Sequence, residues 1–246
     1  MDKESFKIME NSHNHWWYKS RIKILDNVLK NKFSICESNK ILEIGCGTGA
    51  NIDLLSKYGE LFAVEMDEES RKISLAKSKN IKDGNLPDNI PFNDKFSLVC
   101  LLDVLEHIQE DEDSLKTIFK LTENNGKLLL TVPAYQFLWN NHDDVCHHKR
   151  RYTLKDLEKK VINSGFSIEY SSYFNNFLFA PIAMTKILMK FQKKAVNSLT
   201  IFSNESVFSK IQNSIFEFIF SLERKFIPKS KFNFGISIII LAEKIK

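Results

Sequence analysis

The sequence predicts an α/β fold in which a mostly parallel sheet carries helices on both faces. Short apolar runs alternate with helical patterns, as in parallel sheets, where a helix usually forms each crossover. One such run, 41–44, turns on a cluster of glycines directly into a helical pattern. The final run, 236–241, is rich in β-branched residues, as expected of a strand buried on both faces.

Apolar spacing and turn residues set the elements of the first half in order. Residues 5–32 have apolar side chains at helical spacing, so we expect a helix there. Strands and helices then alternate up to Pro133, where the last strand of this part stops. An Asn-Asn-Gly sequence at 124–126 should break the preceding helix. The expected strands are 41–44, 61–65, 96–102 and 127–132, and the expected helices are 51–57, 68–79 and 111–122.

The second half contains one more helix, two strands and a long intervening segment. Thr153 is a good N-cap for a helix that runs to Asn163, and Gly165 is its C-terminal stop. Strands are expected at 166–171 and 235–243. The residues between them exceed a usual connection and show helical patterns around 177–193 and 207–226. We therefore expect a single domain with a helical insertion before the last strand. Its expected parts are an N-terminal helical segment 1–38, a core 39–174, an insertion or lid 175–232, and the last strand 233–246.

Composition is ordinary for a globular protein and excludes little. Apolar residues make up 43% and charged residues 27% of the 246 positions, and the net charge of +4 is too small to indicate a nucleic-acid partner. The four cysteines form no C-x-x-C pair, so we expect reduced thiols in a cytoplasmic protein. The first residues lack an apolar signal-peptide region, and no uninterrupted apolar run is long enough to span a membrane.

The glycine turn after the first strand is the strongest functional signal. Gly45, Gly47 and Gly49 permit positive φ angles and a close approach of a ligand to the backbone. Glu43 precedes them, and a carboxylate there would repel a pyrophosphate. It would attract the ammonium and sulfonium of S-adenosylmethionine. The pattern Gly45-x-Gly47-x-x-Ala50 also fits a dinucleotide, so an NAD(P)-dependent oxidoreductase is the alternative.

The ends of the next strands supply further ligand-binding candidates. Glu65 lies about 20 residues beyond the glycines, where a carboxylate suits the ribose hydroxyls. Met66 would pack on the adenine ring, and Asn85, beside Leu86, would bond the adenine edge. The alternative for Glu65 is a solvated charge at a strand end.

These motifs together resemble class I S-adenosylmethionine-dependent methyltransferases, which have a Rossmann-like, mostly parallel seven-stranded sheet. The resemblance rests on E-I-G-C-G-T-G, V-E-M and L-L-D-V-L-E-H-I, and it covers residues 13–175 and the final strand. The last string is similar to ubiquinone and menaquinone methyltransferases, which implies that Leu101, Leu102 and Asp103 touch the methionine part of the cofactor. A non-catalytic module that keeps this site as a relic is a further alternative.

The same resemblance extends to the N-terminal helix. In quinone O-methyltransferases an arginine after a Trp pair reaches the cofactor carboxylate, which implies this role for Arg21; the alternative for Trp16 and Trp17 is simple helix packing. For His107, the alternative to a functional role is that it caps or packs against the next helix. The predicted cofactor-binding residues are Arg21, Glu43, Gly45, Cys46, Gly47, Gly49, Glu65, Met66, Asn85, Leu86, Leu102, Asp103 and His107.

Residues 132–153 resemble an uncharacterised bacterial subgroup with V-P-A-Y-x-x-L-W-x-x-H-D and H-x-R-R-Y-T, often associated with surface-glycan or lipid-linked sugar pathways. His142 or His147 is expected to accept a proton from the acceptor near neutral pH, and Asp143 to orient that histidine. Arg150 and Arg151 are expected to hold a phosphate or carboxylate. Tyr135 and Tyr152 complete the predicted substrate-binding residues. We expect no metal, although His142, Asp143 and His147 are ligand types; a solvated loop or helix cap is the alternative for the basic residues.

The expected activity is methylation of a hydroxyl on a small-molecule or lipid-linked acceptor, a glycan or an isoprenoid. The apolar patterns of the insertion 175–232 have two explanations. They are a helix pair packed on the sheet or on a second copy, or a lid that meets a lipid tail or the inner membrane face. We expect no nucleic-acid partner.

Overall fold

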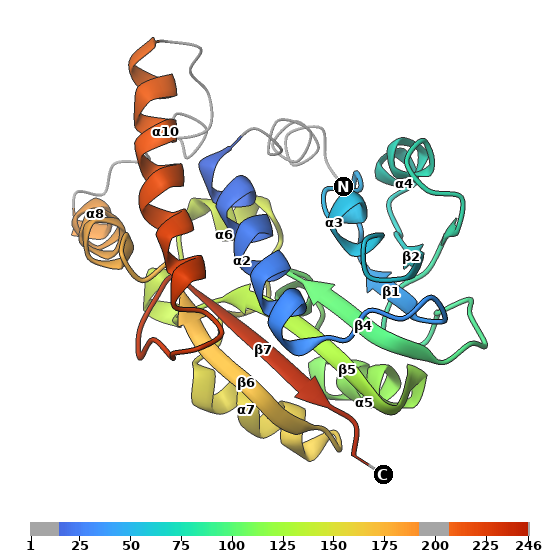
Figure 1. Ribbon diagram of the computed structural model, residues 1–246. Coiled ribbons are helices and arrows are strands. Elements are labelled where there is room, and N and C mark those ends of the chain that lie inside the picture. Colours follow the sequence, from blue (N-terminus) through green and yellow to red (C-terminus); the bar gives the residue numbers. More distant parts are fainter. Residues whose placement is uncertain (1–14, 192–206, 246) are drawn as a thin grey trace.

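The computed structural model describes residues 15–191 and 207–245, and these contain a seven-stranded sheet with helices on both faces (Figure 1). The strand order is β3-β2-β1-β4-β5-β7-β6. Neighbouring strands run parallel except for β7, which is antiparallel to both β5 and β6. The predicted fold class is thus confirmed. The strands are β1 (Lys40–Ile44), β2 (Glu60–Val64), β3 (Ile81–Lys82), β4 (Phe96–Leu102), β5 (Thr122–Pro133), β6 (Ser167–Phe174) and β7 (Ser237–Glu243).

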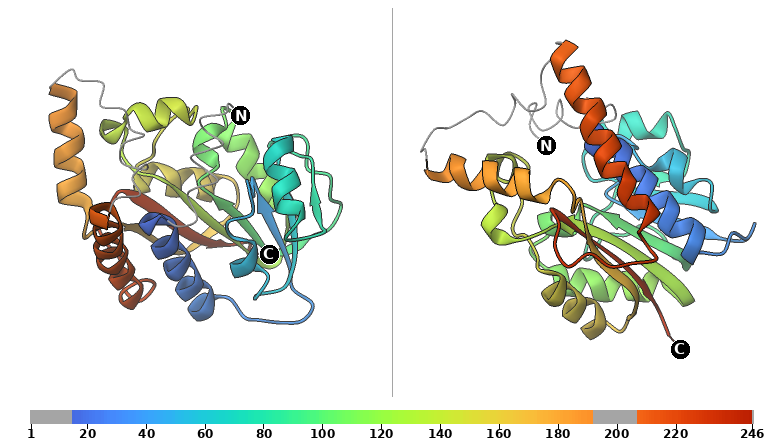
Figure 2. Two further views of the ribbon diagram at one scale, coloured as in Figure 1. Left: turned by 90° about the horizontal axis from the view of Figure 1, so that it is seen from above. Right: turned by 60° about the vertical axis from the view of Figure 1, so that its left-hand side comes forward.

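The helices divide between the two faces. Figures 1 and 2 show α2 and α10 side by side on one face and α5 and α7 on the other. The short helices η2, η3 and α6 follow the carboxyl ends of β4 and β5. The helices are α2 (Trp16–Lys32), α3 (Ile52–Leu55), α4 (Glu68–Leu75), η2 (Leu105–His107), α5 (Asp111–Leu121), η3 (Gln136–Leu138), α6 (Asn141–Val145), α7 (Leu154–Asn163), α8 (Phe179–Phe191), α10 (Val207–Ser221) and η4 (Leu222–Lys225).

The sheet is buried on both sides because its central strands carry apolar residues on both faces. Side chains alternate between faces along a strand. In β4, Leu98, Cys100 and Leu102 pack with α2 and α3, whereas Val99 and Leu101 pack with α5 and α7. Two separate hydrophobic cores result, and the edge formed by the strands' carboxyl ends is left for polar side chains.

Local capping accounts for several element boundaries. The side chain of Thr153 accepts a hydrogen bond from Asp156 N at the start of α7, and Gly165 adopts φ +108° just beyond its end, as predicted. Asp67 caps α4 by accepting from Ser70 N. The predicted helix over 5–32 is present from Trp16; its earlier residues lie outside the described part of the chain.

Two strands differ from the sequence-based prediction. The Asn-Asn-Gly sequence lies inside a strand and not in a turn between helix and strand. Helix α5 ends at Leu121, and β5 begins directly at Thr122, which pairs with Phe96. Asn125 has φ +63°, and its N–H donates to Lys244 O, so the irregular stretch remains bonded within the sheet. β6 likewise runs on to Phe174, where it pairs with β7.

The segment before β7 forms α8, α10 and η4. α10 packs on α2: Trp16 makes edge-on contacts with Phe216 and Phe220, and Lys23 pairs with Glu217 at 2.6 Å. Figure 2 shows α8 and the far half of α10 standing away from the sheet. The division of the chain into a core and an insertion stays a prediction.

Two further expectations concern cysteines and membranes. All four cysteines lie in described positions and none forms a disulfide. Within residues 15–191 and 207–245, no helix combines the length and apolar character needed to cross a bilayer.

Candidate cofactor and acceptor site

The glycine turn after β1 has the backbone that the sequence predicts. Gly45, Gly47 and Gly49 have φ angles of +72°, +55° and +79°, a region that other residues rarely adopt. A Cβ on Gly45 would lie 2.7 Å from a Val104 methyl, so this glycine also allows the turn to pack against the segment after β4. The turn is therefore fixed by both conformation and space.

A buried chain of polar side chains links this turn to α2 and β4. Glu43 Oε1 accepts from Asn51 Nδ2 at 2.6 Å, and Asn51 Oδ1 accepts from an Arg21 Nη2 at 3.1 Å. The other Arg21 terminal nitrogen, Nη1, donates to Asp103 Oδ2 at 2.8 Å, and that oxygen also accepts from Thr131 Oγ1. Arg21 is 2% exposed and lies over the rings of Trp17 and Tyr18. The structure thus brings together three predicted cofactor residues, Arg21, Glu43 and Asp103.

Two atoms of these linked polar side chains have no hydrogen-bond partner among the described residues, Glu43 Oε2 and Arg21 Nε. Burial raises the pKa of Glu43 to about 7, although the hydrogen bond from Asn51 and the charge of Arg21 act the other way. One unsatisfied acceptor and one unsatisfied donor suit the ammonium and carboxylate of an amino acid. The residues present therefore fit the methionine part of S-adenosylmethionine.

Glu65 closes the glycine turn from the neighbouring strand. Its Oε2 accepts from Gly47 N at 2.7 Å and its Oε1 from Asp67 N at 2.8 Å. Burial raises the pKa of this carboxyl, and the two backbone bonds oppose the rise. A solvated charge is excluded, since Glu65 is 8% exposed. Each carboxylate oxygen keeps a second lone pair that could accept a hydrogen bond from a ribose hydroxyl. The ribose-binding role itself stays a prediction.

The other predicted cofactor residues lie around the same turn or on the loops beside it. Met66 is 70% exposed, and its packing on an adenine ring stays a prediction. Asn85 pairs with Asn89 in a small bridge, and Leu86 beside it is buried. Cys46 and Leu102 are buried in the core on the α2 face.

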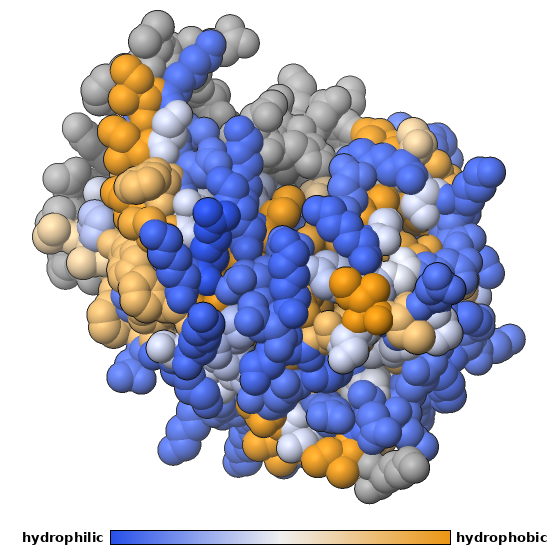
Figure 3. Space-filling view, viewed as in Figure 1, coloured by the Kyte–Doolittle hydropathy of each residue, from blue (hydrophilic) through white to orange (hydrophobic). Residues whose placement is uncertain are grey.

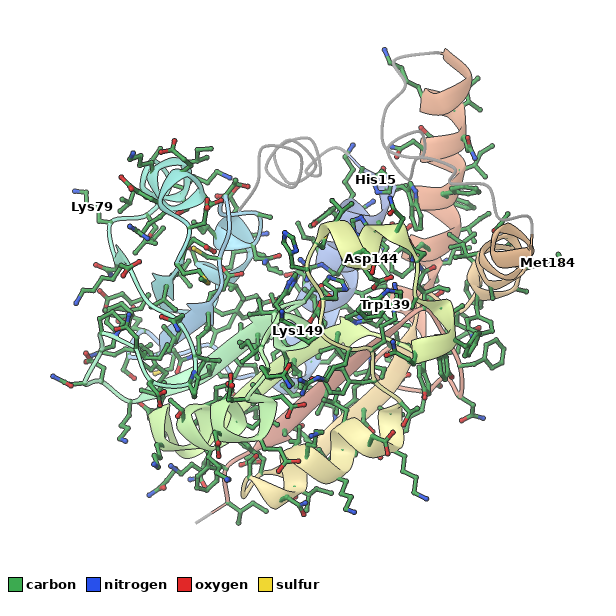
Figure 4. All side chains as sticks on the ribbon, turned by 180° about the vertical axis from the view of Figure 1, so that it is seen from behind. His15, Lys79, Trp139, Asp144, Lys149 and Met184 are labelled. Atoms are coloured by element: carbon green, nitrogen blue, oxygen red, sulfur yellow. The ribbon has the colours of Figure 1, made fainter. Side chains whose placement is uncertain are left out.

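The predicted acceptor segment follows β5 and contains η3 and α6. Figure 4 labels Trp139, Asp144 and Lys149 in it, and Trp139 Nε1 donates to Asp144 Oδ1 at 2.9 Å. Lys149 N donates to Glu106 O at 2.7 Å, which fastens this segment to η2 beside the cofactor residues. The segment is therefore bonded to the chain that follows β4.

Asp143 is the buried centre of this segment. It is 0% exposed, and its carboxylate accepts from Arg151 Nε and Nη2 at 2.7 and 2.9 Å. It also accepts from His148 Nδ1 at 2.8 Å. These partners hold the pKa of Asp143 well below its usual range despite burial. Asp143 thus orients His148, whereas the sequence led us to expect His142 or His147.

Arg150, Arg151 and Tyr152 differ from the expectation that they contact the acceptor. The Arg151 side chain is 4% exposed and is committed to Asp143. Arg150 pairs with Asp111 at 2.9 Å, and the buried Tyr152 hydroxyl donates to the same carboxylate. Their polar groups therefore hold the segment against α5.

The remaining predicted residues lie near this centre. His142 belongs to α6, with its ring 6.3 Å from that of His148. His147 has φ +56° in the turn after α6. Tyr135 has φ +59° and stacks on Tyr173. Their roles in proton transfer and acceptor binding stay predictions.

Sequence reasoning missed Asn51 and His148. Asn51 joins Glu43 to Arg21, and its signal was its place at the start of the helix after the glycine turn. His148 lies within the predicted histidine-rich segment and packs edge-on against His107, with ring centroids 4.5 Å apart.

The fold and the buried polar side chains from Glu43 to Arg21 are those expected of an S-adenosylmethionine-dependent methyltransferase. A family profile described as "Methyltransferase domain" matches residues 16–171. The chain belongs to this methyltransferase family, which confirms the predicted enzyme class and cofactor at family level.

Individual relatives are distant. The Bacillus subtilis protein YrhH, named as a methyltransferase, is 27% identical over 119 residues, covering 45% of this chain and 66% of the relative. The mitochondrial ubiquinone biosynthesis O-methyltransferase of Dictyostelium discoideum is 25% identical over 138 residues, covering 48% and 43%. The chain thus spans less than two thirds of the length of either relative.

Among solved structures, an S-adenosylmethionine-dependent methyltransferase from Clostridium acetobutylicum has a TM-score of 0.58 and 13% identity, covering 94% of this chain and 92% of that one. This likeness concerns the fold.

Proposed function

We propose that this chain transfers a methyl group from S-adenosylmethionine to a hydroxyl of a small-molecule or lipid-linked acceptor. The observation that carries the cofactor part is the pair of unsatisfied buried atoms, Glu43 Oε2 and Arg21 Nε. They match an amino-acid zwitterion, whereas the pyrophosphate of a dinucleotide would place negative charge beside Glu43. This charge argument favours the methyltransferase over the oxidoreductase alternative.

Two features support a hydroxyl acceptor of the isoprenoid or glycan kind. One relative is named as a ubiquinone biosynthesis O-methyltransferase. Residues 132–153 also resemble the bacterial subgroup associated with glycan and lipid-linked sugar pathways.

The chain's own residues have three tasks in this reaction. S-adenosylmethionine supplies an electrophilic methyl group on a sulfonium. Glu43 and Arg21 hold the methionine part, and the α6 segment excludes water from the end of β4. An acceptor oxygen attacks the methyl carbon as the sulfur–carbon bond breaks, and His142 or His147 takes the hydroxyl proton.

The outer face of α10 supports a lipid-linked acceptor. Ile211, Ile215 and Phe218 are 55%, 51% and 65% exposed, and Figure 3 shows an apolar stripe along this helix. We assign this stripe to a lipid surface that carries the acceptor. Sedimentation with vesicles should recover the wild type, and Phe218→Ser with Ile215→Ser should remain in the supernatant. Equal recovery of both proteins, or of neither, would contradict the assignment.

A methyl-transfer screen tests the function. Purified protein and labelled S-adenosylmethionine are incubated with fractionated lipids, glycans and small metabolites, with the Glu43→Gln variant as the matched control. We expect label in one class of acceptor with the wild type only. Label that enters protein or nucleic acid instead would refute the acceptor class, and a failure to bind cofactor would refute the whole proposal.

A further inference from the structure

Three side chains that the proposed mechanism does not use meet beside the cofactor residues. Glu106 and His107 come from η2 after β4, and His148 comes from the turn after α6. Each offers one ligand atom, and these three atoms lie within 4.8 Å of one another. The backbone bond from Lys149 N to Glu106 O holds the two segments together at this point.

One of the two histidines, His148, is already oriented in the way that metal ligands usually are. His148 Nδ1 lies 2.8 Å from Asp143, whose carboxylate also binds Arg151 and therefore accepts the Nδ1 proton. This leaves His148 Nε2 with its lone pair. The His107 ring packs edge-on against the His148 ring, with ring centroids 4.5 Å apart, so the two imidazoles lie next to each other. A carboxylate or carbonyl behind a histidine is the usual second partner of a histidine ligand.

Glu106 is a buried carboxyl with an unsatisfied oxygen. It is 1% exposed, and its Oε2 has no hydrogen-bond partner among the described residues. A buried carboxyl oxygen without a partner is costly, and a divalent cation bound there would supply one.

We propose that Glu106, His107 and His148 form a binding site for a divalent first-row transition metal, with Zn²⁺ as the reference ion. Two imidazoles and one carboxylate favour such an ion over Mg²⁺ or Ca²⁺, which prefer oxygen ligands. Zinc–nitrogen bonds of about 2.0–2.1 Å place ligand atoms about 3.4 Å apart, so ligand atoms that lie up to 4.8 Å apart must approach by up to about 1.4 Å. This inference departs from the metal-free site expected from the sequence.

His107 is exposed, which leaves one side of the cluster open for a further ligand. Glu106 follows Asp103 by three residues after the end of β4, so the metal would lie near the residues proposed to bind the methionine part. An acceptor hydroxyl bound to the metal would lose its proton more easily. This role rests on the proposed function, whereas metal binding itself does not.

The test measures metal binding in the absence of cofactor and acceptor. Chelator-treated full-length protein is titrated with Zn²⁺ in competition with a chromophoric chelator. We expect one bound equivalent in the wild type, and affinity at least about tenfold weaker in Glu106→Gln and in His148→Gln. Circular dichroism establishes that each variant is folded, and Glu106→Gln keeps the shape of the side chain.

Two neighbours serve as controls, because His142 lies 3.6 Å from the Cys146 sulfur and this pair also has metal-ligand types. His147→Gln and Cys146→Ser should bind Zn²⁺ as the wild type does. With Co²⁺ in place of Zn²⁺, visible d–d bands should appear without a thiolate charge-transfer band. The proposal is overturned if no equivalent binds, if affinity is unchanged in Glu106→Gln and His148→Gln, or if it is lost in Cys146→Ser.

Discussion

Cofactor affinity should depend on pH through Glu43. This carboxyl is fully buried, and its pKa of about 7 in the ligand-free protein means that it is half protonated near neutral pH. Its charged and polar neighbours are Arg21 from α2, Asn51 at the start of α3 and Glu65 after β2. A bound ammonium group would stabilise the ionised form, so the proton must leave when the ligand binds.

The sign and size of the effect follow from this linkage. Below the pKa the carboxyl carries a proton that binding must remove, so affinity falls as pH falls; above it the site is already ionised. At pH 6 the dissociation constant should be about tenfold larger than at pH 8, or about 1.4 kcal/mol. S-adenosylhomocysteine is the suitable ligand, because it keeps the amino group and does not react.

Calorimetric titration in two buffers of different ionisation enthalpy measures both affinity and proton release. The wild type should release a proton at pH 6 and almost none at pH 8. Glu43→Gln cannot titrate, so its affinity should be low and independent of pH, and the wild type should approach it in acid. A flat wild-type profile, or the same slope in Glu43→Gln, would refute the assignment of the ammonium to Glu43.

Three other substitutions have expected outcomes. Gly45→Ala should lose about 2 kcal/mol of stability or more and most cofactor affinity, because φ is positive and the new methyl meets Val104. Adding Val104→Ala removes the clash and should restore only part of the stability, as measured by thermal melting. Full restoration would contradict the argument from backbone strain. Arg151→Gln should lower the unfolding free energy in urea by about 3–5 kcal/mol, since it removes the bidentate cationic partner of the buried Asp143 carboxylate. The more exposed Arg150→Gln should cost about 1 kcal/mol. A smaller loss for Arg151 than for Arg150 would count against the structural role. Glu223→Ala should remove the two hydrogen bonds from Asn176 N and Phe177 N, before α8, and lower the unfolding free energy by about 2–3 kcal/mol. Proteolysis of 175–232 should then become faster. An unchanged rate would contradict the role of Glu223 in holding this segment.

Much of the fold is predictable because the spacing of apolar residues along a short segment shows which of its faces are buried. Strand β4 matches its predicted range, since a continuous apolar run is typical of a strand covered on both faces. The start of β5 was not predictable from Asn124 to Gly126, whose turn-forming composition is overridden by pairing with Phe96 and Lys244. The reversed direction of β7 leaves no trace in hydrophobicity, because a strand presents the same faces in either direction.

The site divides in a similar way. Glu43 and Glu65 were recognisable because each has a fixed place relative to the glycine turn. Arg150 and Arg151 were assigned to the acceptor because no local sequence pattern shows that they form ion pairs with Asp111 and Asp143. His148 was missed because the left-handed turn at His147, with φ +56°, decides which histidine faces Asp143.

The central claim is that the polar side chains at the ends of β1 and β4 bind the amino-acid part of S-adenosylmethionine. Equilibrium dialysis of labelled S-adenosylmethionine against the full-length protein, with unlabelled NADPH as competitor, tests it directly. We predict one bound nucleoside per chain that excess NADPH does not displace. Displacement by NADPH, or retention of NADPH where the labelled donor fails to bind, would contradict the account.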